Sequence, residues 1–144
     1  MEHVAIMKKE WHLTEKILTG EKKIESRWYM SRHSPWNKIE KGEFVYFKDS
    51  GEPVTIRTET KKILQFSNLN PGKVREIIGK YGGDDGINVD DIQKFYERFK
   101  DRKYCILIFL KNPRKIKSFK INKEGFGLMS AWLTVDNINK LRNK

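Results

Sequence analysis

The sequence is poor in cysteine, in acidic side chains relative to basic ones, and in long apolar runs. Its single cysteine, Cys105, excludes a disulfide framework within the chain and a zinc site built on several cysteines. No apolar stretch approaches the roughly 20 residues that cross a bilayer, so we expect no membrane partner. A single thiol and no recognisable signal peptide indicate a reducing compartment, and we expect a cytoplasmic protein.

What the sequence does contain is enough apolar and aromatic material for a folded core. Four Trp and eight Phe among 144 residues argue against a disordered chain. The length fits one domain, which we expect to span residues 1–144. Cys105 lies in the apolar run YCILIFL, where we expect it to be a small core residue.

The net charge is strongly positive, at +11, because the chain has 30 Lys and Arg residues and 19 Asp and Glu residues. Such a surface attracts polyanions, of which nucleic acid is the commonest. A second interpretation is that Lys is a general surface choice, as in the Lys- and Glu-rich proteins of thermophiles. Charge alone therefore favours a nucleic-acid partner without demonstrating one.

Hydrophobic periodicity predicts an α+β domain. We expect a small closed or half-closed β-barrel with peripheral helices, because strands and helices alternate too sparsely for a doubly wound sheet. The predicted strands are 3–9, 22–30, a hairpin over 43–66, 102–110 and 115–121. The predicted helices are 10–20, 70–83 with Asn70 as N-cap, 89–100, and one from about residue 135. The apolar face of 89–100 comprises Ile92, Phe95, Tyr96 and Phe99.

The stretch GEKKIESRW, residues 20–28, gathers opposite charges at the start of a predicted strand. Gly20 follows the last turn of a helix, and Lys22 lies at the bend. Glu25 and Arg27, two residues apart, share one strand face. If that face points into a barrel mouth, the three charges form a recess for a nucleobase or phosphate. If it points to water, they are an ordinary surface pattern of small energetic value.

These residues carry a resemblance to a known family. Gly20, Lys22, Glu25 and Arg27 resemble the G-x-K-x-x-E-x-R signature of the ASCH domain family, whose members are similar to PUA domains, small β-barrels associated with RNA. The later KIEKGEFVYF resembles the strand entry common in that family. As a whole the chain looks like an archaeal-type member, with a PUA-like core of about 3–112 and a C-terminal extension, 113–144.

The resemblance implies an RNA- or nucleotide-binding cavity lined by Lys22, Glu25 and Arg27, with Gly20 permitting the bend. One bacterial branch of the family is an amidohydrolase that uses a lysine, a threonine and a glutamate. Lys22 matches the lysine, but Glu25 stands where the threonine would be, so the hydroxyl nucleophile is missing. Asp84 or Asp85 is the nearest counterpart of the distal glutamate. If the protein is an enzyme, Lys22 and Glu25 are its candidate catalytic residues.

Other stretches could add contacts. Arg32 and Trp36, in a polar loop over 31–42, can hold phosphate and stack a base, or simply belong to that loop. Lys115 and Lys117 can contact phosphate, or serve as a solvated strand edge that blocks aggregation. The three histidines show no metal spacing, so we expect no metal and no cofactor. The run GKYGGDDG lacks the ending of a phosphate-binding loop, and no serine–histidine–aspartate order is visible.

These observations predict an RNA- or nucleotide-binding module that uses a charged barrel-mouth pocket and basic loops at 31–38 and 111–120. The alternative is a hydrolase acting on a modified nucleoside or RNA in the same pocket. A third hypothesis, a protein-interaction module, predicts a large exposed apolar patch instead of a charged recess.

Overall fold

The computed structural model describes residues 1–127 and 130–142. In that part of the chain, six strands form one mixed sheet in the order β2-β5-β4-β3-β1-β6, with β1 and β3 parallel and every other pair antiparallel. The strands are β1 (Glu2–Met7), β2 (Ile24–Tyr29), β3 (Phe44–Asp49), β4 (Val54–Phe66), β5 (Tyr104–Phe119) and β6 (Trp132–Val135). The helices are α1 (Leu13–Thr19), α2 (Pro71–Tyr81) and α3 (Ile92–Phe99), with short 3₁₀ turns at Lys9–Trp11, Val89–Asp91 and Ile138–Lys140.

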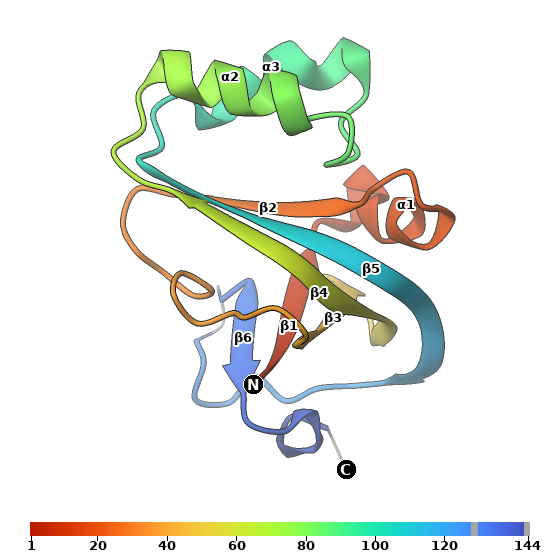
Figure 1. The fold of residues 1–144 in the computed structure, drawn as a ribbon. Helices are drawn as coiled ribbons and strands as arrows, with labels where there is room; N and C mark the ends of the chain where they lie inside the picture. The colour runs from red at the N-terminus through yellow and green to blue at the C-terminus, as the bar shows by residue number, and fades with distance from the viewer. Residues whose placement is uncertain (128–129, 143–144) are drawn as a thin grey trace.

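The sheet curls into a half-barrel (Figure 1), which confirms the predicted α+β, PUA-like fold class. Its edge strands are β2 and β6. A side chain of β2 nevertheless reaches the opposite edge, because Arg27 donates to the carbonyls of Ala131, next to β6, and Ile6 in β1. The curl therefore brings the two edges of the sheet together at Arg27.

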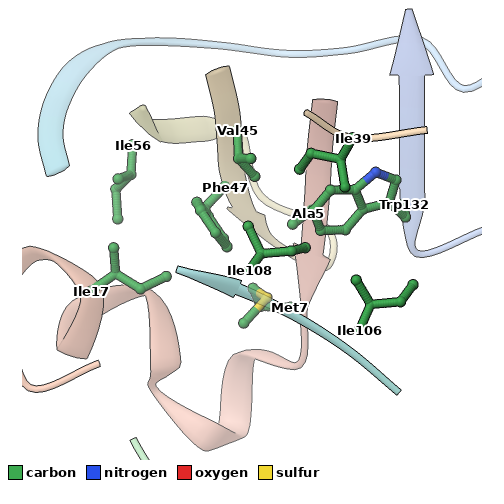
Figure 2. Packing of buried hydrophobic residues seen from close by; sticks show 10 residues of the cluster. All are labelled: Ala5, Met7, Ile17, Ile39, Val45, Phe47, Ile56, Ile106, Ile108 and Trp132. Atoms are coloured by element: carbon green, nitrogen blue, oxygen red, sulfur yellow. The ribbon is translucent and has the colours of Figure 1, made fainter. Parts of the chain in front are cut away.

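The first half of strand β5 is buried on both faces from Cys105 to Ile108, as its apolar run predicts, whereas the second half is largely exposed. Ile106 and Ile108 point into the curl, where side chains from β1, β3, α1 and β6 converge on them (Figure 2). Cys105 and Leu107 point outward and pack under α2 and α3. The thiol of Cys105 is fully buried, so it is a core residue.

Helices α2 and α3 lie side by side over the outer face of β2 and β5 (Figure 1). The Asn70 side chain accepts from the Lys73 N–H at 2.9 Å, as expected of an N-cap. The predicted apolar face of α3 packs in the same outer cluster: Ile92, Phe95, Tyr96 and Phe99. None of the helices in the described part of the chain has the length and apolar character needed to cross a membrane.

Two predicted elements at the C-terminal side were wrong. Residues 102–110 and 115–121 are not separate strands, because β5 runs from Tyr104 to Phe119 through Asn112 and Pro113. Asn112 adopts a positive φ of 51°, and the register with β4 shifts there, so a bulge absorbs the proline instead of ending the strand. The helix expected from about residue 135 is absent from the described residues. There Trp132–Val135 pairs with β1, and only a 3₁₀ turn follows.

The first predicted helix, 10–20, is interrupted. His12 adopts a left-handed conformation between a 3₁₀ turn and α1. Ile17 is buried, but Trp11 and Leu18 are 38% and 39% exposed, so the apolar face is narrower than the spacing suggests. Gly20 ends α1 with φ of 86°, a conformation that glycine adopts without the strain other residues incur.

Candidate functional site

The bend after α1 buries a lysine completely. Lys22 is 2% exposed, and its ammonium donates to the carbonyls of Ile24 at 2.6 Å and Asp85 at 2.7 Å. It also donates to Asp85 Oδ1 at 2.6 Å and pairs with Glu25 Oε1 at 3.2 Å. Burial alone would lower the pKa of Lys22, but the two carboxylates outweigh it and raise that pKa above its ordinary value. Lys22 is therefore a charged group whose donors are all in use.

Glu25 links Lys22 to Arg27. Its Oε2 accepts from Arg27 Nη2 at 2.8 Å and Nε at 3.2 Å, a two-point contact that fixes the guanidinium plane. Burial opposes ionisation of Glu25, but Lys22 and Arg27 overcome this and lower its pKa. Glu25 and Arg27 share the inner face of the sheet, opposite Ile108 and Ile106 in the register. The structure thus brings the three signature side chains together inside the curl.

The fourth member of this cluster comes from the turn after α2. Asp85 contacts Lys22 through Oδ1 and accepts from the Ser26 hydroxyl through Oδ2 at 2.5 Å. Burial raises the pKa of Asp85, and Lys22 is the main neighbour that opposes the rise. Of the two aspartates considered as counterparts of a distal carboxylate, only Asp85 reaches Lys22. Asp84 instead uses its backbone carbonyl to accept from Lys23 and Ile24.

Arg27 connects this cluster to a cavity. Its side chain is 12% exposed, and its guanidinium carbon lies 5.2 Å from the centre of the Trp132 ring. Nη1 donates to the Ala131 carbonyl at 3.2 Å. Arg27 also interacts with the Tyr29 hydroxyl, and this contact opposes the rise that burial causes in the pKa of Tyr29.

The cavity measures about 500 Å³, within the usual range for small-molecule sites. Three basic residues and three aromatic residues contribute to it, and no acidic residue lines it in the described ranges. Its walls come from β2, the loop 33–38 and the C-terminal segments 125–126 and 130–134. The lining residues are Arg27, Tyr29, His33, Ser34, Lys38, Gly125, Phe126, Ser130, Ala131, Trp132 and Thr134.

The other candidate residues lie outside this lining. Lys22 and Glu25 are behind Arg27, fully buried. Arg32 lies over the rings of Trp36 and Tyr104, at 5.8 Å and 5.7 Å from their centres, so it is already stacked.

Lys115 and Lys117 are exposed on the far half of β5. The side chains of Ile116 and Phe119 in this half pack against the cluster that contains Leu133 and Val135 of β6.

Sequence reasoning missed most of the cavity wall. Tyr29 stands in the signature strand, two residues after Arg27, so the alternation of that strand could have identified it. Phe126 and Trp132 belong to the tail segment with two glycines and a tryptophan, whose placement depends on pairing with β1. In the described part of the chain, no group of histidine, cysteine or acidic residues has the geometry of a metal site.

The half-barrel sheet with helices on its outer face is a PUA-like fold, and several solved structures share this fold. The ASCH protein from Zymomonas mobilis is 15% identical, with 96% of this chain and 90% of that chain covered and a TM-score of 0.67. The hypothetical protein PH0355 is 21% identical, with coverages of 78% and 97% and a TM-score of 0.52.

A protein from Enterococcus faecalis V583, assigned to the family DUF984, is 10% identical, with coverages of 85% and 84% and a TM-score of 0.55. No family model matches the chain, and no curated protein matches it. The chain has the fold of an ASCH domain.

Proposed function

We propose that the protein binds single-stranded RNA or a nucleotide, with one nucleotide held in the cavity beside Arg27. The observation that carries this proposal is the lining of the cavity, where the described residues include basic and aromatic side chains and no acidic one. Bases stack on aromatic rings, and guanidinium and ammonium groups bind phosphate. The net charge of +11 adds attraction at longer range.

Within this proposal, each part of the signature has a separate task. Arg27 offers the exposed part of its guanidinium to phosphate or to a base edge. Glu25 and Lys22 hold the guanidinium in place and do not themselves contact the ligand. Gly20 allows the chain to turn from α1 into β2.

Basic groups outside the cavity extend the proposed contact along the strand of RNA. Lys38, on the cavity rim, is exposed, and its ammonium donates to Ser34 Oγ at 3.1 Å. Arg32 and Trp36 lie on the same loop, and Lys115 and Lys117 would meet phosphates farther along. Each such phosphate contact releases counterions, so binding is expected to weaken steeply with salt.

The alternative function, hydrolysis by Lys22 and Glu25, is less favoured by the geometry. Both side chains are buried and occupied by each other and by Asp85, and neither lines the cavity. A substrate would have to displace this network to reach them.

The test is a salt titration of binding to a fluorescently labelled ten-nucleotide RNA, measured by anisotropy. Lys38→Ala removes one charge at the cavity rim, and Lys94→Ala removes the same charge on α3, on the outer face of the sheet. We expect Lys38→Ala to weaken binding about threefold to tenfold and to lower the salt slope by about 0.7. Lys94→Ala should bind like the wild type. Equal effects of the two variants would reduce the interaction to non-specific charge attraction and overturn the proposal.

A further inference from the structure

A second cavity lies at the same end of the sheet as the cavity beside Arg27. It measures about 380 Å³ and is formed by the end of β4, the connection to α2 and the first turns of α2. Tyr29, which lines the cavity beside Arg27, pairs with Tyr104 at the start of β5. On the other side of β5, Phe66 of the second cavity pairs with Cys105. The two cavities are therefore about two strand spacings apart, or roughly 10 Å.

The loop 33–38 connects the two cavities. Three of its residues line the cavity beside Arg27. Its Asn37 is held by Gln65, which lines the second cavity, through two hydrogen bonds. The Asn37 N–H donates to Gln65 Oε1 at 2.8 Å, and Gln65 Nε2 donates to Asn37 Oδ1 at 2.8 Å. Figure 1 shows this loop leaving β2 at the end of the sheet where α2 begins, so a bound chain that crosses the loop reaches the second cavity.

The second cavity carries charges of both signs above an apolar floor. The floor comprises Phe66, Leu69 and Ile77. Lys73 and Glu76 lie one turn apart on α2 and both line the cavity, yet they form no ion pair with each other. Within the described residues, neither the Lys73 ammonium nor the Glu76 carboxylate has a hydrogen-bond or ion-pair partner. Both charged groups are therefore available to a ligand.

We propose that the second cavity binds the neighbouring nucleotide of the same RNA and selects a base with an exocyclic amino group. Glu76 accepts from that amino group, and Lys73 pairs with the phosphate. Phe66 supplies a ring against which the base packs. Uracil presents a carbonyl oxygen where cytosine presents its amino group, so uracil leaves the carboxylate facing another acceptor.

This division of tasks follows from the difference between the two linings. The described lining of the cavity beside Arg27 has no carboxylate, so it lacks the charged acceptor that separates cytosine from uracil. Its cations bind phosphate, which is the same in every nucleotide. Choice of base is therefore assigned to Glu76 in the second cavity. The inference rests on the proposed function, because the RNA has to be bound beside Arg27 for the second cavity to receive its neighbour.

The experiment compares fluorescein-labelled decamers of cytidine and of uridine by anisotropy at neutral pH. Their bases differ in the exchange of an amino group for a carbonyl oxygen. We expect the wild type to bind the cytidine decamer about tenfold more tightly. An adenosine decamer, tested in parallel, distinguishes adenine from cytosine as the source of the amino group.

Two variants with the same chemical change locate the preference. In Glu76→Gln the amide can donate to the uracil carbonyl, so the affinities for cytidine and uridine should come within about twofold of each other. Glu21→Gln changes an exposed carboxylate in the turn between α1 and β2, at the opposite end of β2, and should keep the tenfold difference. Lys73→Ala should weaken binding of both decamers alike and lower the salt slope by about 0.7.

The outcomes separate this inference from the proposed function. Equal binding of the cytidine and uridine decamers by the wild type, or a tighter uridine complex, overturns the inference and leaves RNA binding beside Arg27 intact. A preference for cytidine that persists in Glu76→Gln, with thermal unfolding showing that the variant is folded, overturns it as well. Failure of every decamer to bind at low salt overturns the proposed function and this inference together.

Discussion

Replacing Lys22 by methionine tests whether the signature lysine is a structural ion or a ligand group. The substitution keeps a long side chain but removes the ammonium that contacts Asp85 at 2.6 Å and Glu25 at 3.2 Å. Glu25 keeps Arg27 as a partner, but Asp85 keeps only the Ser26 hydroxyl and is left as an unpaired carboxylate in the interior.

The expected cost follows from that burial. Removing one partner of a buried ion pair destabilises a protein by about 3–5 kcal/mol. A domain of this size has a total stability of about 5–15 kcal/mol, so the variant should fold with much of its margin lost. With a urea dependence of roughly 2 kcal/mol per molar, the midpoint of unfolding should fall by about 2 M.

The assay is urea unfolding followed by circular dichroism, with Lys23→Met as the control. Lys23 is the exposed neighbour in the sequence, so the same chemical change there should cost less than about 0.5 kcal/mol. The loss of unfolding free energy caused by Lys22→Met should also grow from pH 5 to pH 8. Without Lys22 the raised pKa of Asp85 rises further, so the folded variant retains a proton that the unfolded chain loses as the pH increases.

Equal midpoints for Lys22→Met and Lys23→Met would refute this reasoning. If Lys22→Met were as stable as the wild type yet failed to bind RNA, Lys22 would be a ligand group and the assignment of a structural role would be wrong.

Two further predictions concern stability. Burial lowers the pKa of His3, so below about pH 6.5 the unfolded chain binds a proton that the native state does not. The contribution of His3 to stability is therefore present above about pH 6.5 and is lost as the pH falls toward the lowered pKa. Thermal melts between pH 5 and 8 should show a weaker pH dependence for His3→Gln than for the wild type, and parallel curves would contradict this. Gly79→Ala, at an exposed position in the last turn of α2, should raise the free energy of unfolding by about 0.5–1 kcal/mol, whereas Gly20→Ala, at φ of 86°, should lower it by about 1–2 kcal/mol. Urea midpoints that move in the same direction for both glycines would contradict the backbone argument.

Much of the fold was predictable because it depends on short-range patterns. The alternation of strand β2 correctly placed Glu25 and Arg27 on one face, and the apolar run within 102–110 correctly indicated a buried strand, which forms the first half of β5. The N-cap at Asn70 was predictable for the same reason, because its side chain accepts a hydrogen bond from Lys73, only three residues later in the sequence.

The contacts inside the site could not be predicted, because they depend on the pairing of strands and turns that lie far apart in the sequence. Asp85 meets Lys22 from 63 residues away, and Thr134 meets His3 from 131 residues away. The second contact exists only because Trp132–Val135 pairs with β1, and no strand was predicted there; a helix was expected from about residue 135. Asn112 misled the prediction differently, since an Asn-Pro pair usually ends a strand and here it makes a bulge.

The most direct test of the central claim uses the four tryptophans as reporters in an NMR titration with the ten-nucleotide RNA. Trp132 lines the cavity, whereas Trp28 lies under α3 on the outer face and Trp11 lies beside Lys8 and Arg98. If RNA enters the cavity, the indole N–H signal of Trp132 shifts on binding while that of Trp28 stays in place. A shift confined to Trp11, with Trp132 unchanged at saturation, would place the RNA elsewhere and contradict the account.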